Sequence, residues 1–311
     1  MSQDDRPVVM ITSRNMGGPL QGRLEAEGWR PVYAGELSDD DRQAVRASIG
    51  AGENAMAPDF LSTLPNLKLV ACISAGYDGV DVGWCRAHGI EVTHAQGTNA
   101  EAVADHAMGM LIGGWRNVVA GDRAFRAGKW RGELGGRPGL RGRKVGIVGL
   151  GHIGVAIAER CIPFGMEIAW WGPNPKPDAK WPRAESLKAL AEWCDILMIA
   201  SAANAQNRGM IDREIIEAVG PRGMIVNVGR GSIIAEDELI SALKDKRLGR
   251  AALDVFEEEP TPLERWADVP GAVVLTPHIA GGTVESMPAM VGQAIENIRR
   301  HLAGEALLSP V

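Results

Sequence analysis

The stretch that decides the fold is residues 144–154, which read KVGIVGLGHIG. The apolar run at 144–148 predicts a strand, and Gly149 to Gly154 form the pattern G-x-G-x-x-G before a predicted helix at 155–160. In this context the first Gly makes a tight turn, the second lets a pyrophosphate approach the backbone, and the third lets helix and strand pack closely. The helix N-terminus also favours phosphate. We therefore expect a dinucleotide here, in contact with Gly149, Gly151, His152, Ile153 and Gly154.

The turn after the next predicted strand, at 167–171, bears on which dinucleotide is bound. NAD calls for an Asp or Glu at this point, which accepts hydrogen bonds from the ribose hydroxyls. The sequence WGPNPK at 171–176 has none, and the first carboxylate is Asp178. Asn174 and Lys176 are candidates for holding a 2′-phosphate, with a solvated Lys176 as the alternative. The sequence thus favours NADP and leaves NAD open; Trp171 is a candidate neighbour of the adenine.

The rest of the chain alternates short apolar runs with helical segments, which predicts parallel sheets with crossover helices. The second half has the six strands of a complete Rossmann domain, predicted at 144–148, 167–171, 196–199, 224–228, 251–254 and 272–275. Predicted strands at 7–12, 67–74 and 90–94 indicate a smaller second domain.

We predict an α/β fold of two doubly wound parallel-sheet domains, with the active site in the cleft. Residues 1–98 and 285–311 are expected to form a flavodoxin-like substrate domain, and residues 99–284 the Rossmann dinucleotide-binding domain. A long helix at 99–128 and a helix at 283–303 are expected to cross between the two.

Composition narrows the class of protein. The chain has 33 Lys and Arg against 39 Asp and Glu, a net charge of −6, which does not suit nucleic acid or an anionic membrane. No run approaches the ~20 apolar residues of a membrane span, and the polar N-terminus does not resemble a signal peptide. The 4 cysteines lack the CxxC spacing of a zinc site. We expect a cytoplasmic protein with no metal site.

Five motifs occur in an order that resembles one enzyme family. They are SAGYD at 74–78, the glycine pattern followed by FGM at 164–166, VNVGRG at 226–231, LDVFEEEP at 253–260 and LTPHIAG at 275–281. Over nearly its full length the chain resembles the D-isomer-specific 2-hydroxyacid dehydrogenases, and among them most closely the glyoxylate/hydroxypyruvate reductases. The resemblance implies NAD(P)H-dependent reduction of a small 2-oxo acid to the D-2-hydroxy acid.

The resemblance assigns the chemistry to three residues. Arg230 is expected to hold the substrate carboxylate and polarise its carbonyl, and His278 to exchange the proton. Glu259 is expected to orient His278 and keep it protonated. The alternatives are a surface ion-pair role for Arg230 and a buried turn role for His278. No such partner is expected for His88, His94, His106, His152 or His301.

Further contacts are expected around these three. The amides of Ala75 and Gly76 should bind the substrate carboxylate, and the polar loop at 51–54 offers Gly52 and Asn54, the latter as a substrate contact or a turn residue. Asp254 matches a position that bonds the nicotinamide carboxamide, with a strand-end cap as the alternative. The cofactor site is completed by Val228, Gly229 and Ala280. Gly229, where the family often has Ala or Ser, is expected to widen the pocket floor.

Other functions share this fold. A dinucleotide-sensing binding protein resembling the carboxy-terminal-binding co-repressors should carry long extra segments that this chain lacks, and a phosphoglycerate dehydrogenase-like enzyme stays open. Formate dehydrogenase needs a different partner for the histidine. We also expect a homodimer, because the segment 99–128 and the loop at 130–138 offer more apolar surface than one small domain covers.

Overall fold

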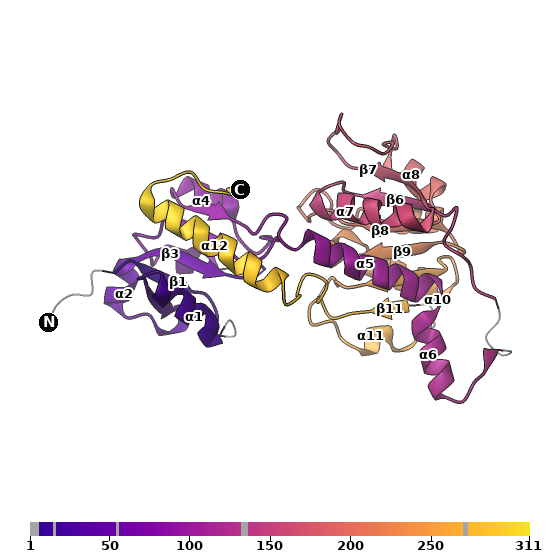
Figure 1. The fold of residues 1–311 in the computed structure, drawn as a ribbon, viewed down its shortest axis with the longest axis horizontal. Helices are drawn as coiled ribbons and strands as arrows, with labels where there is room; N and C mark the ends of the chain where they lie inside the picture. The colour runs from indigo at the N-terminus through magenta and orange to yellow at the C-terminus, as the bar shows by residue number, and fades with distance from the viewer. Residues whose placement is uncertain (1–5, 15–16, 54–55, 132–135, 270–272) are drawn as a thin grey trace. The chain divides into compact units, whose positions relative to one another are not determined.

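The computed structural model describes residues 6–14, 17–53, 56–131, 136–269 and 273–311, and the chain forms two compact units (Figure 1). The first unit comprises Met1–Asn99 and Thr283–Val311, and the second comprises Ala100–Gly282. Each is built on a parallel sheet with helices on both faces. The predicted fold class, two doubly wound α/β domains, is confirmed.

The sheet of the first unit has the strand order β2-β1-β3-β4-β5, as in flavodoxin-like folds. Its strands are β1 (Val8–Ile11), β2 (Arg30–Tyr33), β3 (Val45–Gly50), β4 (Leu69–Cys72) and β5 (Glu91–Thr93). The sequence patterns predicted β1, β4 and β5 but missed β2 and β3. β2 carries Pro31, which an edge strand tolerates. In β3, Arg46 and Ser48 interrupt the apolar pattern although Ser48 is buried.

Helices cover both faces of this first sheet. On one face, Leu24 of α1 (Gly17–Ala26) and Ile298 of α12 (Ser286–Ala303) share an apolar core with Ile11. On the other face, Leu61 of α3 (Pro58–Leu61) and Cys85 of α4 (Val82–Ala87) form a second core. The short α2 (Asp39–Ala44) begins at a capping box built by Ser38 and Asp41. The last helix of the chain therefore packs on the strands with which the chain begins.

The sheet of the second unit has the order β11-β10-β9-β8-β6-β7. All six strands coincide with predicted ones to within a residue: β6 (Lys144–Val148), β7 (Glu167–Trp171), β8 (Ile196–Ile199), β9 (Met224–Asn227), β10 (Arg250–Leu253) and β11 (Val273–Leu275). One face is covered by α5 (Ala100–Trp115) and α7 (His152–Cys161). The other is covered by α8 (Leu187–Trp193), α9 (Arg213–Val219) and α10 (Glu236–Lys244).

The predicted single helix at 99–128 is wrong in one respect. It is divided into α5 and α6 (Val118–Arg126), because Asn117 adopts a left-handed conformation with φ 53°. Gly114 of α5 lies close to β9, since a Cβ there would lie 2.5 Å from Cε of Met224. The short α11 (Glu264–Ala267) follows β10.

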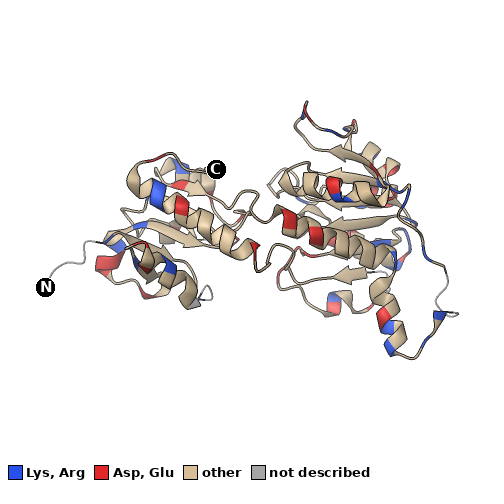
Figure 2. Ribbon diagram, viewed as in Figure 1, with Lys and Arg blue, Asp and Glu red and all other residues tan. Residues whose placement is uncertain are grey.

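Charged side chains are distributed over the helices of both units (Figure 2). On α12, for example, Arg299 and Arg300 both pair with Glu296. Within the described ranges, no helix is both long enough and apolar enough to cross a membrane, and no His, Cys, Asp and Glu side chains form a cluster suited to a metal ion. All four cysteines are buried free thiols, and burial raises the pKa of Cys161 to about 12.

Candidate active site

The glycine-rich turn joins β6 to α7 and gives each glycine a different environment. Gly149 has φ +92° and donates its N–H to Trp171 O at 2.9 Å, which ties the turn to β7. A Cβ on Gly154 would lie 2.1 Å from Gly149 O, so only glycine lets α7 start this close to the turn.

The second glycine of the pattern borders open space. A Cβ on Gly151 would meet no atom within 4 Å, although Gly151 caps α7 and precedes His152 and Ile153 in its first turn. Backbone at a helix N-terminus beside open space is what a pyrophosphate needs. The residues present therefore fit a dinucleotide.

The turn after β7 carries no carboxylate at 172–177. Gly172 is buried, whereas Asn174 and Lys176 are exposed to solvent. Trp170 is the core tryptophan, 1% exposed, while Trp171 is partly buried against the core on the α8–α10 face. This turn is thus open to an anion and offers no acid to a ribose diol.

The candidate residues of the second unit gather at one edge of its sheet. Val228 directly follows β9, Asp254 directly follows β10, and Ala280 lies in the loop after β11. The glycine turn follows β6 at the same edge, because the carboxyl ends of parallel strands lie together. In doubly wound folds this edge is where ligands bind.

His278 and Glu259 form a direct pair at this edge. His278 Nδ1 lies 2.6 Å from Glu259 Oε2, and the side chains are 34% and 36% exposed. Glu259 Oε1 accepts the N–H of Phe256 at 2.9 Å, which fixes the carboxylate. Because Nδ1 faces the carboxylate, Nε2 is the ring nitrogen expected to exchange a proton with a ligand.

The electrostatics of this pair favour the ionised form of Glu259. Partial burial alone would raise the pKa of Glu259. Hydrogen bonds from His278 and from the Phe256 N–H outweigh it, together with the positive charges of His278 and Arg230, and the pKa of Glu259 lies below its usual value. Glu259 is therefore ionised near neutral pH and can hold a proton on its partner.

Arg230 stands at the start of the single turn η5 (Gly231–Ile233). Its Nη1 donates to Gly229 O at 2.9 Å, and its own carbonyl accepts Asn227 Nδ2 at 3.0 Å. The guanidinium is partly buried and near enough to act on the charge of Glu259. The three residues assigned to the chemistry therefore belong to one site.

Gly229 has a structural explanation different from the one expected. A Cβ there would lie 2.7 Å from Ser201 O, a backbone atom. The glycine thus allows two chain segments to approach each other closely. Its N–H donates to Asn227 Oδ1 at 3.0 Å, which fixes the same turn.

Asp254 fixes the loop that carries His278. Its buried carboxylate accepts the N–H groups of Ile279 and Ala280 at 3.0 and 2.9 Å, and its carbonyl accepts the His278 N–H at 2.8 Å. His278 itself has φ 53°, so the loop needs such support. In these contacts Asp254 acts as the strand-end cap that the sequence left as its alternative role.

Two further residues complete this support, and sequence patterns did not identify them. Thr276 Oγ1 donates to Asp254 Oδ1 at 2.6 Å, and His106 Nε2 lies 2.9 Å from the same hydroxyl. Because the hydroxyl proton goes to the carboxylate, His106 must donate from Nε2. A carboxylate partner was not expected for His106 or His301, and this is wrong for both: His106 Nε2 lies 3.5 Å from Asp254 Oδ1, and His301 Nδ1 lies 2.9 Å from Glu91 Oε2.

The first unit contains Ala75 and Gly76, whose amides are expected to bind the substrate carboxylate. Ser74 Oγ accepts the Gly52 N–H and donates to Gly76 O, both at 2.7 Å, so this hydroxyl ties two loops together. The amide of Gly52 is thus occupied. In the described part of the chain, no hydrogen bond uses the N–H of Ala75 or Gly76, which stay available as donors. Asn54 lies outside the described residues.

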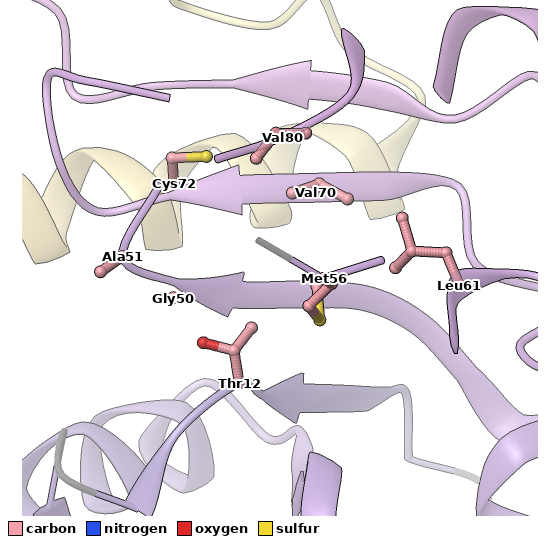
Figure 3. A pocket seen from close by; sticks show the side chains of 8 residues that line it. All are labelled: Thr12, Gly50, Ala51, Met56, Leu61, Val70, Cys72 and Val80. Carbon is pink, nitrogen blue, oxygen red and sulfur yellow. The ribbon is translucent and has the colours of Figure 1, made fainter. Parts of the chain in front are cut away.

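A small pocket lies at the carboxyl ends of β1 and β3 in the first unit (Figure 3). It is lined by Thr12, Gly50, Ala51, Met56, Leu61, Val70, Cys72 and Val80. Apart from the Thr12 hydroxyl this lining is apolar, and the space is that of about one water molecule. The pocket is therefore too small for an organic ligand.

Comparison with known proteins agrees with this geometry. Residues 108–280 match the sequence profile described as D-isomer specific 2-hydroxyacid dehydrogenase, NAD binding domain. Glyoxylate/hydroxypyruvate reductase A of Arabidopsis thaliana is 38% identical over 284 residues, which covers 91% of this chain and 90% of the relative. The 2-ketogluconate reductase of Gluconobacter oxydans is 36% identical over 270 residues, covering 86% of each.

Among solved structures, an NADPH-dependent glyoxylate/hydroxypyruvate reductase from Sinorhizobium meliloti, in complex with NADP and malonate, superposes with a TM-score of 0.89. It is 31% identical and covers 99% of this chain and 97% of its own. The similarity thus extends over both units.

Proposed function

Because the chain belongs to the D-isomer specific 2-hydroxyacid dehydrogenase family, whose members are NAD(P)-dependent oxidoreductases, we propose that it reduces a small 2-oxo acid to the D-2-hydroxy acid. Glyoxylate and hydroxypyruvate are the first candidates, because relatives of 38% and 35% identity are named for them. The observation that carries the proposal is the 2.6 Å contact between His278 and Glu259 at the ligand-binding edge of the sheet.

In the proposed reduction, each functional group has one role. The nicotinamide, when bound, supplies a hydride to the carbonyl carbon. Nε2–H of the His278 imidazolium protonates the carbonyl oxygen, and the resulting neutral imidazole regains its proton from solvent. Arg230 binds the substrate carboxylate and polarises the carbonyl, as a guanidinium fork does well. The amides of Ala75 and Gly76, which no hydrogen bond among the described residues uses, are proposed as further donors to a substrate carboxylate.

The proposed cofactor preference is NADP over NAD. The support is the turn after β7, which has no carboxylate at 172–177 and exposes Asn174 and Lys176. Asn174→Asp places a negative charge where a 2′-phosphate is expected, so it should weaken NADPH and let a ribose diol gain a bond. An unchanged ratio of kcat/KM for NADPH and NADH would show that Asn174 does not face the 2′ position.

One experiment tests the activity and its specificity together. Glyoxylate, hydroxypyruvate, hydroxyphenylpyruvate and 2-ketogluconate are each assayed with NADH and with NADPH, because the names of relatives span these four acids. We expect turnover of at least one small acid, faster with NADPH. Absence of turnover with all four, by a protein that still binds NADPH, would contradict the proposal.

A homodimer is proposed on the basis of exposed apolar groups beyond α5. Val118 and Phe125 of α6 are 56% and 63% exposed, and Trp130 is 66% exposed with its ring centroid 6.2 Å from that of Phe125. Part of the loop at 130–138, residues 132–135, lies outside the described residues. Light scattering that gives the mass of one chain at micromolar concentration would contradict a dimer.

We also propose a cytoplasmic location, which is supported by the four buried free thiols.

A further inference from the structure

A short segment pairs with the open edge of the second sheet. Trp170 N–H donates to Pro182 O at 3.0 Å, and Ala184 N–H donates to Trp170 O at 2.8 Å. Residues 182–184 therefore lie parallel to β7, which is the terminal strand of its sheet. This pairing places Arg183 beside Trp170, at the turn that follows β7.

The guanidinium of Arg183 contacts that turn directly. Nη2 donates to Gly172 O at 2.7 Å and lies 3.4 Å from Pro173 O, while Nε lies 3.3 Å from Gly172 O. The guanidinium carbon is 5.8 Å from the centroid of the Trp170 ring. These contacts fix the plane of the guanidinium and leave the Nη1 hydrogens without a partner among the described residues.

The charge of Arg183 is also unopposed at short range. It forms no ion pair in the described ranges of the chain, and residues 172–177 contain no Asp or Glu. Lys176 in the same turn adds a second positive charge. In a Rossmann fold this turn faces the ribose of the adenosine half.

We infer that Arg183 binds the 2′-phosphate of NADP in this protein, with Lys176 as a second cation. The inference rests on the proposed preference for NADP and names the residue that produces it. The Nη1 hydrogens of Arg183 remain to donate to phosphate oxygens, and the guanidinium is already held by two carbonyls, so little side-chain entropy is lost on binding. Arg183 follows the turn at a distance in sequence, which explains why no Arg is needed at 172–177.

The test uses two probes that differ only in the phosphate in question, adenosine 2′,5′-bisphosphate and adenosine 5′-monophosphate. Their affinities are measured by isothermal titration calorimetry at fixed ionic strength. For Arg183→Gln we expect the bisphosphate to bind about 10- to 100-fold more weakly, as for loss of hydrogen bonds to a charged group, and the monophosphate to change little. Arg183→Lys should lose part of this affinity, because an ammonium is a point charge.

The control is Lys188→Gln on α8, which removes the same charge from a residue paired with Glu214 at 2.6 Å. It should leave both affinities unchanged. If Arg183→Gln weakens both probes equally, Arg183 only braces the turn, and if it weakens neither, it does not contact the phosphate; either result overturns the inference. If the parent protein binds both probes equally, the proposed NADP preference is itself wrong, and the inference with it.

Discussion

Glu259→Gln separates the charge of the acid–base pair from its geometry. A glutamine side chain keeps the shape of Glu259, and its oxygen can still accept the Phe256 N–H, while its NH2 group then faces His278 Nδ1 and can donate to that nitrogen when the ring is neutral. The negative charge is lost, while the positive charge of Arg230 stays. The imidazolium then loses its negatively charged partner, so it releases its proton at lower pH.

The size of the shift follows from distance and exposure. A charge-assisted hydrogen bond is worth about 1.5–3 kcal/mol when shielded, and an exposed ion pair only about 0.2–1 kcal/mol. At 2.6 Å, with 34% and 36% of the two side chains exposed, this pair lies between these cases. About 1.4 kcal/mol corresponds to one pH unit, so we expect the profile to move by about one unit.

The assay is kcat/KM against pH in both directions. Reduction needs the imidazolium, so in the variant its rate should begin to fall about one pH unit lower than in the parent. Oxidation needs the neutral ring and should extend to lower pH by a similar amount. Glu258→Gln is the control, since it removes the same charge from the exposed neighbouring residue. If the parent and Glu259→Gln give the same pH profiles, the charge of Glu259 does not hold the proton on His278, and this reasoning is refuted.

His278→Gln should keep dinucleotide affinity and lower turnover by about 10²–10⁴-fold, and near-parental turnover would remove His278 from the chemistry. Gly151→Ala should leave the melting temperature unchanged and weaken dinucleotide binding, because its Cβ would enter open space. Gly154→Ala should instead destabilise the fold by about 1–3 kcal/mol in urea unfolding, because its Cβ would lie 2.1 Å from a backbone oxygen; equal behaviour of the two variants would contradict their assigned roles. Thr276→Val should lower the free energy of unfolding by about 1–3 kcal/mol and lower kcat, because Asp254 and His106 lose their hydrogen bonds to the hydroxyl. Thr276→Ser keeps the hydroxyl and should retain stability and activity. A valine variant as stable and active as the serine variant would contradict this role of Thr276.

Elements of the fold were predictable from the sequence where a local residue pattern is enough to define them. The glycine turn and the six strands of the second unit were predictable because buried parallel strands form short apolar runs bounded by turns. β3 was missed because burial of Ser48 and the position of Arg46 depend on neighbouring strands. The break at Asn117 depends on one left-handed residue that no periodicity reveals.

The same contrast applies to the site. Arg230, Glu259 and His278 lie in motifs that mark the family, so the resemblance identified them. Thr276 and His106 meet across 170 residues of sequence, and their contact exists only once α5 packs on the sheet. Arg183 reaches the turn after β7 through pairing at a sheet edge, a contact set by tertiary structure and not by spacing.

The order in which the chain enters the two units determines the order in which they can complete folding during synthesis. The second unit is one continuous segment, Ala100–Gly282, so it has all its strands and helices once residue 282 has left the ribosome. The first unit has its five strands much earlier, but one face of that sheet is closed by Ala294, Ile295 and Ile298 of α12. That face of the nascent N-terminal sheet can be covered in part by α1, and the rest of it stays open to water or to a chaperone until α12 has been synthesised.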